Sequence, residues 1–451
     1  MLDRVWSLAV IRFLMVPWWG ALATPAQAAE GPEVLGIPVD FILFAATLLG
    51  VALFHHQVLK VALTGLAVIA LYKITVTGFK TGAGLAGFSA HMAHESVLLA
   101  NLFCLLVGFA LLARHFEDSG LPEVLPKLLP ASWLGPFLLL AIIWVLSGFL
   151  DNIAAALIGG TVAASVFKRR LHLGYLAAIV AASNAGGAGS VVGDTTTTMI
   201  WIAGISSLEV APAYVASLVA LVVFGVPAAL QQNSHQPIVR HLQVAHHVDW
   251  MRIGIVVFML VAAIVTNVTV NIKFPELADH FPFLGVAVWV ALLLAVPLRK
   301  PEWSLVPDAV KGTVFLLALV TCASMMPVDK LPSASWQTTL GLGFISSVFD
   351  HIPLTALALK QGGYDWGFLA FAVGYGGSML WFGSSAGVAV ANLFPEARSV
   401  GQWLWYGWHI PIAYLAGFFT MLLLVGWNPR EHPKELAAEA PAVSVMPAHG
   451  H

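Results

Sequence analysis

The chain has 451 residues, of which 59% are hydrophobic and only 10% are charged, and its mean hydropathy is +0.86. Soluble domains carry roughly 25% charged residues, so this composition predicts an integral membrane protein. A net charge of −2 without a basic stripe argues against nucleic-acid binding. The two cysteines, Cys104 and Cys322, lie inside apolar runs, so we expect no disulfide framework.

The two ends of the chain differ from the rest. Arginines, an apolar stretch and Ala26-Gln27-Ala28 follow one another in the order of a secretory signal, which predicts a signal peptide over residues 1–28. Pro17 interrupts the apolar stretch, so an uncleaved anchor is the alternative. Residues 430–451 are polar and rich in Ala, Pro and Glu, which predicts a disordered tail.

Long apolar runs predict the membrane-spanning helices. A helix needs about 20 apolar residues to cross the bilayer. Runs that fit this length predict spans at 37–54, 58–76, 95–113, 208–230, 251–271, 283–298, 310–326 and 402–426.

Two apolar runs do not fit this length. Residues 134–167 are too long for one span, and their only polar break is Asp151-Asn152. Residues 336–359 repeat the pattern around Asp350-His351. We interpret each as a re-entrant hairpin, which dips into the protein and returns to the side it came from.

Two further regions, 171–205 and 366–394, contain glycine-rich stretches in mid-segment, Asn184–Gly189 and Gly374–Gly377. Glycine costs about 1 kcal/mol relative to alanine within a helix, so both regions are predicted to be broken helices.

Hairpin and broken helix therefore occur twice, within residues 37–230 and 251–426. Aligning Gly186-Gly187 with Gly376-Gly377 places Asp194 on Ser384. An odd number of spans separates the copies, so they face opposite ways across the membrane. The predicted fold class is an all-α polytopic membrane protein of two inverted repeats with about ten full spans, the architecture of secondary transporters.

The distribution of basic residues predicts the orientation. With the mature N-terminus and the tail outside, the inner segments collect more Lys and Arg than the outer ones, and Lys168-Arg169-Arg170 returns the first hairpin to the inner side. We expect a multi-pass protein of a bacterial-type inner (plasma) membrane.

Three acidic residues, Asp151, Asp194 and Asp350, lie centrally in apolar segments. An Asp at a helix centre costs about 2.5 to 3.5 kcal/mol on insertion scales, so each is a functional candidate. Carboxylates, free carbonyls and hydroxyls suit a hard cation, which predicts that these three residues ligate transported Na⁺ or Li⁺ rather than a structural metal. The structural alternative is that they only cap half-helices.

Burial and nearby carboxylates favour the protonated form of a carboxylic acid, and a bound cation opposes it, so competition between Na⁺ and H⁺ would produce exchange. Of the successive threonines after Asp194, at most two can face a site, and the others are expected to bond back to carbonyls. The further candidate ion or proton ligands are Asn152, Ser183, Asn184, Thr195, Thr196, His351, Ser378, Ser384 and Ser385.

The segment Ser183–Trp201, SNAGGAGSVVGDTTTTMIW, resembles the signature of NhaD-type sodium/proton antiporters, within the ion-transporter superfamily that includes citrate and dicarboxylate carriers. Leu150-Asp151-Asn152, Phe349–Leu354, Gly376–Ser378 and Gly383–Gly387 are similar as well. The likeness covers roughly residues 40–426. It implies Na⁺(Li⁺)/H⁺ exchange with matching Asp residues as ion ligands, and it suggests a homodimer.

The chain departs from this family at two places. His351 stands where members commonly carry Asn, and Gly189 replaces a bulky aromatic residue. A histidine at this position is either a pH sensor or proton relay, or a simple hydrogen-bond donor.

Other functions compete with antiport. A Na⁺- or H⁺-coupled citrate or dicarboxylate transporter is the main alternative, although three deep acids would repel an anion. An intramembrane aspartyl protease is disfavoured because Leu150 and Val192 stand where its motifs need Tyr and Gly. His91, His94 and Glu95 share a helical face but lack the HExxH spacing, so a metal site there is disfavoured too.

The predicted function is a secondary transporter that exchanges Na⁺ or Li⁺ for H⁺ by alternating access. We expect no enzymatic activity and no cofactor. The expected partners are monovalent cations, protons and the lipid bilayer, with no nucleic acid.

Overall fold

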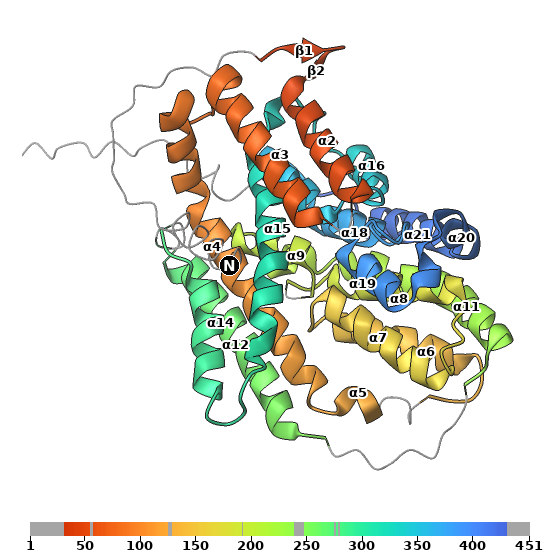
Figure 1. The fold of residues 1–451 in the computed structure, drawn as a ribbon. Helices are drawn as coiled ribbons and strands as arrows, with labels where there is room; N and C mark the ends of the chain where they lie inside the picture. Colours follow the sequence, from red (N-terminus) through yellow and green to blue (C-terminus); the bar gives the residue numbers. More distant parts are fainter. Residues whose placement is uncertain are drawn as a thin grey trace, which may run out of the picture.

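The structure is a computed structural model that describes residues 31–430 except 55–56, 125–128, 192, 239–247, 275–276 and 278–279. The predicted signal peptide, and the predicted tail beyond Arg430, lie outside these residues. The described part is built from helices, with one small antiparallel sheet of β1 (Glu33–Val34) and β2 (Ile37–Pro38) (Figure 1). The helical fold class predicted from the sequence is confirmed.

The first half of the chain contains ten α-helices and one π-helix among the described residues. They are α2 (Val39–Leu53), α3 (Val58–Tyr72), the π-helix η1 (Lys73–Thr77), α4 (Gly84–Glu117), α5 (Leu121–Val124), α6 (Leu134–Ser147), α7 (Asn152–Val166), α8 (Leu173–Gly187), α9 (Thr195–Ile202), α10 (Ser207–Val210) and α11 (Ala213–His235).

The second half repeats the succession of long helices, hairpin and short helices. Its elements are α12 (Trp250–Lys273), α14 (Phe283–Ala295), η3 (Trp303–Leu305), α15 (Val306–Ser324), η4 (Val328–Lys330), α16 (Trp336–Ser346), α17 (His351–Gln361), α18 (Trp366–Gly376), α19 (Ser385–Leu393), η5 (Pro395–Arg398), α20 (Val400–Tyr406) and α21 (His409–Leu424).

Side-chain caps fix where several helices begin. Asp249 accepts a hydrogen bond from the backbone N–H of Met251 at the start of α12, and Asp365 accepts two at the start of α18. Ser335 and Thr338 form a reciprocal capping box at the start of α16. These side chains satisfy N–H groups that have no partner within the helix, so the sequence specifies these starts locally.

Helices that could cross a membrane are prominent among the described residues. Five are long and apolar enough, and a sixth is counted if the bent pair α20–α21 is one span: Val58–Thr77, Gly84–Glu117, Ser207–His235, Trp250–Val270, Trp303–Ser324, and Val400–Tyr406 with His409–Leu424. Shorter apolar helices include α2, α6, α7, α8, α14 and α18. A polytopic membrane protein is therefore supported, while the total of about ten spans and the inverted orientation stay predictions.

Four predicted spans differ from the observed helices. At 37–54 and 283–298 the structure has only the shorter helices α2 and α14. The expected span 95–113 belongs to the 34-residue helix α4, which at 1.5 Å per residue is about 51 Å long. The expected span 402–426 is divided into α20 and α21, which meet at an angle of 59°. Pro411 explains this division, because a proline ring clashes with the carbonyl four residues earlier, here that of Gly407.

Both predicted hairpins are pairs of short helices. Within residues 134–167, α6 and α7 pack against each other and are separated by Gly148–Asp151. Within residues 336–359, α16 and α17 are separated in the same way just before His351. The chain thus interrupts its helix at Asp151 and at Asp350.

Both predicted broken helices are interrupted at their glycine-rich stretches. Between α8 and α9, and between α18 and α19, the chain leaves the helix for several residues. The glycines permit close backbone contacts: a Cβ on Gly186 would collide with the carbonyl of Trp144 in the first hairpin, and one on Gly376 with the carbonyl of Gly343 in the second. A glycine in each broken helix thus allows its backbone to pack directly against the backbone of the hairpin in the same half of the chain.

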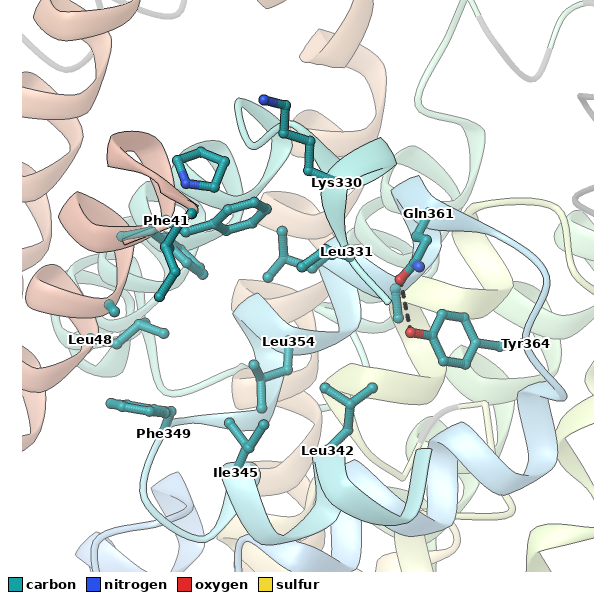
Figure 2. A pocket seen from close by; sticks show the side chains of 17 residues that line it. Phe41, Leu48, Lys330, Leu331, Leu342, Ile345, Phe349, Leu354, Gln361 and Tyr364 are labelled. Atoms are coloured by element: carbon teal, nitrogen blue, oxygen red, sulfur yellow. Dashed lines mark hydrogen bonds between the residues drawn. The ribbon is translucent and has the colours of Figure 1, made fainter. Parts of the chain in front are cut away.

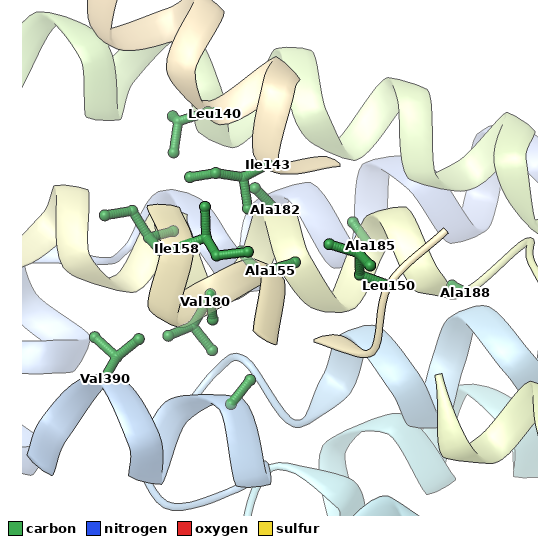
Figure 3. Packing of buried hydrophobic residues seen from close by; sticks show 14 of the residues in the cluster. Leu140, Ile143, Leu150, Ala155, Ile158, Val180, Ala182, Ala185, Ala188 and Val390 are labelled. Carbon is green, nitrogen blue, oxygen red and sulfur yellow. The ribbon is translucent and has the colours of Figure 1, made fainter. Parts of the chain in front are cut away.

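The first halves of the broken helices form the centre of the molecule. Every residue from Gly174 to Gly187 in α8 is buried, and so is every residue of α18. Figure 3 shows apolar side chains of α6, α7 and α8 gathered together, among them Ile143, Ile158 and Val180. A helix that is apolar and buried on all sides has its position set by packing, so the polar residues at its end are held in fixed places.

Candidate functional site

The two hairpin carboxylates have the same local geometry. Asp151 precedes α7, and its Oδ2 accepts a hydrogen bond from the backbone N–H of Ile153 at 3.2 Å. Asp350 precedes α17, and its Oδ1 accepts from the N–H of Ile352 at 3.0 Å. The capping role that the sequence left open is therefore observed for both residues.

Asp194 occupies the same kind of position but does not cap its helix. It precedes α9, and no hydrogen bond links its side chain to the first turn. Its Oδ1 instead accepts from Asn152 Nδ2 at 3.1 Å and lies 3.2 Å from His351 Nε2. The carboxylate is therefore held by both hairpins at once.

The second oxygen of this carboxylate has a different environment. Asp194 is 1% exposed, and among the described residues its Oδ2 has no hydrogen-bond partner. A Cβ on Gly374 would lie 3.0 Å from this oxygen, so the glycine leaves room beside it. A buried carboxylate oxygen without a partner is costly unless a cation or a proton neutralises it.

Asn184 connects the first broken helix to the second. Its Nδ2 donates to Ser378 Oγ at 2.9 Å and to Ser384 Oγ at 3.1 Å, and its Oδ1 accepts from Asn152 at 3.0 Å. The amide groups of Asn152 and Asn184 thus join the two halves of the chain through one buried network.

The remaining polar contacts surround Asp350. Ser385 Oγ donates to Asp350 Oδ2 at 3.2 Å, and His351 Nδ1 lies 3.9 Å from Asp350 Oδ1. Asp151 directly precedes Asn152 in the chain and caps the same helix. We call the whole set the polar cluster, and it consists of Asp151, Asn152, Asn184, Asp194, Asp350, His351, Ser378, Ser384 and Ser385.

Three predicted site residues lie outside this cluster. The Ser183 hydroxyl donates back to the carbonyl of Val180, and Thr195 is buried in the first turn of α9. Thr196 Oγ1 lies 3.4 Å from Thr355 Oγ1 of α17 and joins α9 to the second hairpin. The hydroxyls of Ser183 and Thr196 thus make contacts within or between helices, although the sequence analysis named both residues as candidate ligands.

Thr197 and Thr198 bond back to a carbonyl, as expected from the sequence. Both hydroxyls donate to the carbonyl of Asp194, at 2.8 and 2.9 Å. These bonds occupy the backbone oxygen of Asp194 while its carboxylate is directed elsewhere.

Sequence reasoning did not identify Thr355 and Gly374. Thr355 lies one helical turn after His351, and this spacing was the available signal. Gly374 occupies the position in the second broken helix that corresponds to Asn184 in the first. Its importance comes from an absent side chain, which no motif of polar residues reveals.

The three carboxylates differ in where their side chains are directed and in how exposed they are. No group of three or more His, Cys, Asp or Glu side chains that could hold a metal ion is present among the described residues. Asp151 and Asp350 are turned toward helix N-termini, whereas Asp194 is directed toward the hairpins. The side chain of Asp350 is 13% exposed, whereas Asp194 is buried.

The histidines of the HMAHE segment have structural contacts. His91 Nε2 lies 3.0 Å from Ser324 Oγ, and the ring stacks on Phe79 with a centroid distance of 5.5 Å. These contacts agree with the preference against a metal site there.

An apolar crevice lies beside the second hairpin. It has a volume of about 380 Å³ and separates α2 from α16 and α17, with Phe41, Leu48, Ile345 and Leu354 among its walls (Figure 2). None of the cluster residues lines it. The crevice therefore concerns the contact between helices rather than the binding of an ion.

Comparisons with known proteins identify relatives over most of the chain, while no family model matches it. The sodium/proton antiporter 1 of Arabidopsis thaliana is 26% identical over 322 residues, which are 60% of this chain and only about half (53%) of that relative. The Na⁺/H⁺ antiporter NhaD of Vibrio parahaemolyticus is 26% identical over 74% of this chain and 97% of its own length. NhaD of Alkalimonas amylolytica is 25% identical over 75% and 86%.

These relatives are named as antiporters, and they give no support to the citrate or dicarboxylate alternative or to a protease. The matches with the two NhaD proteins cover 97% and 86% of those proteins' own lengths. The chain is therefore similar to NhaD-type sodium/proton antiporters over about three quarters of its length.

Proposed function

We propose that this protein is a secondary transporter that exchanges Na⁺ or Li⁺ for H⁺ across the membrane. Asp194 is the central ligand, and Asp151 and Asp350 take part from the hairpin tips. The similarity to proteins named as Na⁺/H⁺ antiporters and the helices long enough to cross a membrane support this proposal.

The observation that carries the proposal is the unpartnered Oδ2 of Asp194. A fully buried carboxylate needs neutralisation, and both a proton and a small cation supply it. Because one carboxylate cannot hold both, binding of one ion releases the other. Exchange follows from this competition without a cofactor.

Alternating access is the proposed means of transport. Helices α2, α3, α4, α12, α14 and α15 pack on one another and would form a scaffold. The hairpins and broken helices would move as a second unit, because α7 packs on α19 and α17 packs on α9 across the two halves. The crevice between α2 and the second hairpin leaves space for such a movement (Figure 2).

The location and assembly of the protein belong to the same proposal. We place it in a bacterial-type inner membrane, with the mature N-terminus and tail outside, on the evidence of the basic residues in the sequence. A homodimer is proposed from the resemblance to the superfamily.

Reconstitution tests the function directly. Proteoliposomes that contain the full-length protein and a pH-sensitive dye should alkalinise their lumen when Na⁺ is added outside, because Na⁺ enters as H⁺ leaves. Asp194→Asn should abolish this signal and leave membrane insertion intact. A lumen that stays unchanged with the wild-type protein, together with uptake of labelled citrate, would contradict antiport.

A further inference from the structure

A tight turn that carries three basic residues joins the end of α7 to the start of α8. Lys168 and Arg169 have φ angles of 51° and 58°, a left-handed conformation that L-residues rarely adopt. The N–H of Arg169 donates to the carbonyl of Ala164 at 2.7 Å, and that of Arg170 to Phe167 at 2.9 Å. These bonds fix a tight turn, and its three basic side chains are exposed.

These three cations differ from eight other Lys and Arg residues of the described chain. In the described ranges of the chain, no carboxylate forms an ion pair with Lys168, Arg169 or Arg170. Eight other Lys and Arg residues do have carboxylate partners: Lys73, Lys80, Arg114, Arg252, Arg299, Lys311, Lys330 and Arg430. Three consecutive unpaired cations form a local site of strong positive charge.

The basic turn is attached to the end of α11. Gln232 Nε2 donates to the carbonyl of Arg170 at 3.1 Å, and its Oε1 accepts from the N–H of His172 at 2.8 Å. Gln232 is fully buried, so the turn has a defined position relative to α11.

A hollow of about 600 Å³ lies beside this attachment. Four polar residues line one part of it: His172, Gln231, Ser234 and His235. The rings of His172 and His235 are 5.7 Å apart. This part of the hollow therefore offers hydrogen-bonding groups next to the basic turn.

The other part of the hollow is apolar. It is lined by Pro227 and Leu230 of α11 and by Trp408, and the last two are 47% and 48% exposed. Along one face of α11, the lining changes from Pro227 to His235 over a rise of about 12 Å. Along α11, the apolar residues Pro227 and Leu230 therefore precede the polar residues Ser234 and His235.

We propose that this hollow binds an anionic phospholipid. The acyl chain would lie along Pro227, Leu230 and Trp408, and the phosphate headgroup would contact the polar wall and the basic turn. Basic residues between helices at a membrane surface attract anionic headgroups, and Trp is favoured at the membrane interface. The exposed apolar wall explains why the occupant is a lipid rather than free phosphate.

The proposed lipid would link the first hairpin and broken helix to α11 and to the junction of α20 and α21. The site uses none of the residues of the polar cluster, so it does not depend on the proposed function. Its test is likewise a binding measurement and not a transport assay.

The test measures lipid binding to the detergent-solubilised full-length protein by native mass spectrometry. Phosphatidylglycerol should bind at least tenfold more tightly than phosphatidylcholine. The triple variant K168Q/R169Q/R170Q should weaken phosphatidylglycerol binding on the order of 100-fold, since each basic residue near an anionic surface contributes to the attraction. Trp408→Ala should weaken long-chain phosphatidylglycerol more than a short-chain form.

A matched control uses three other exposed basic side chains that lack carboxylate partners among the described residues. K60Q/K273Q/K300Q removes the same charge and should leave the lipid preference unchanged. An equal loss in both triple variants would overturn the proposal in favour of nonspecific attraction. Equally strong competition by glycerol phosphate would overturn it in favour of a soluble anion.

Salt provides a test that needs no variant. One molar NaCl shortens the screening length to about 3 Å, so the preference of the wild-type protein for phosphatidylglycerol should fall at least fivefold. A preference that persists unchanged in high salt would exclude the basic turn as its cause, even if the triple variant does not fold.

Discussion

The first and second halves of the chain build their helix breaks from the same backbone and different chemistry. Asp194 and Ser384 have nearly the same backbone angles, with φ of −146° and −142° and ψ of 145° and 154°. The Ser384 hydroxyl accepts from the N–H of Gly387 and caps its helix. The Asp194 carboxylate leaves its own helix and accepts from the hairpins instead.

The hairpins show the same relation. Asp151 and Asp350 cap equivalent helices, while the residues after them differ, being Asn152 and His351. Both of these residues contact Oδ1 of Asp194. The two halves therefore have similar backbone at these helix starts, while the side chains at and after these positions differ.

The largest expected effect comes from making the two halves alike at this position. Asp194→Ser should reduce Na⁺-dependent exchange at least 100-fold, because it removes the most deeply buried of the three candidate carboxylates. The protein should still fold, since Ser384 shows that serine suits this backbone. The exchange rate in proteoliposomes and the elution profile from size-exclusion chromatography measure the two outcomes.

Ser384→Ala is the matched control. It removes a helix cap worth about 1 kcal/mol and one bond to Asn184, so exchange should persist at a reduced level. Loss of exchange as complete as in Asp194→Ser would show that the carboxylate is not what distinguishes the halves.

The next largest effect tests whether the close backbone contacts at Gly186 and Gly376 are equally important in the two halves. Gly186→Ala and Gly376→Ala should each destabilise the protein by about 1 to 3 kcal/mol, because a Cβ at either position collides with a hairpin carbonyl. Gly341 lies within α16 and has nothing within 4 Å of an added Cβ, so Gly341→Ala should not destabilise the protein, because alanine is favoured over glycine in a helix by about 1 kcal/mol. Thermal unfolding of the purified variants measures the loss of stability. If alanine is tolerated at only one of the two positions, the two glycines are not equivalent.

The smallest effect concerns His351. His351→Asn gives both hairpins the same residue after the aspartate, and an asparagine can still donate one hydrogen bond to Asp194, as Asn152 does. We expect exchange to persist within about tenfold at its best pH. If the imidazole titrates during transport, the dependence of rate on pH should move, and an unchanged profile would reduce the ring to a hydrogen-bond donor.

The amino-acid sequence was sufficient to predict the helical membrane fold and the places where helices are interrupted. A carboxylate without a partner and a run of glycines are both unfavourable inside an apolar helix. The helices are accordingly interrupted at Asp151, Asp194 and Asp350. The division of α20 from α21 also has a local cause, Pro411. The span prediction missed it because the whole run 402–426 is apolar.

Only the tertiary structure decided how the three carboxylates differ. Nothing in their local sequence distinguishes a capping Asp from one that faces across the molecule, because the difference depends on which donors approach from distant segments. Asn152 and His351 reach Asp194 since both hairpins pack on central helices whose positions the apolar core determines. Side-chain direction at long range is a property of packing, and it separates the most deeply buried carboxylate from the two helix caps.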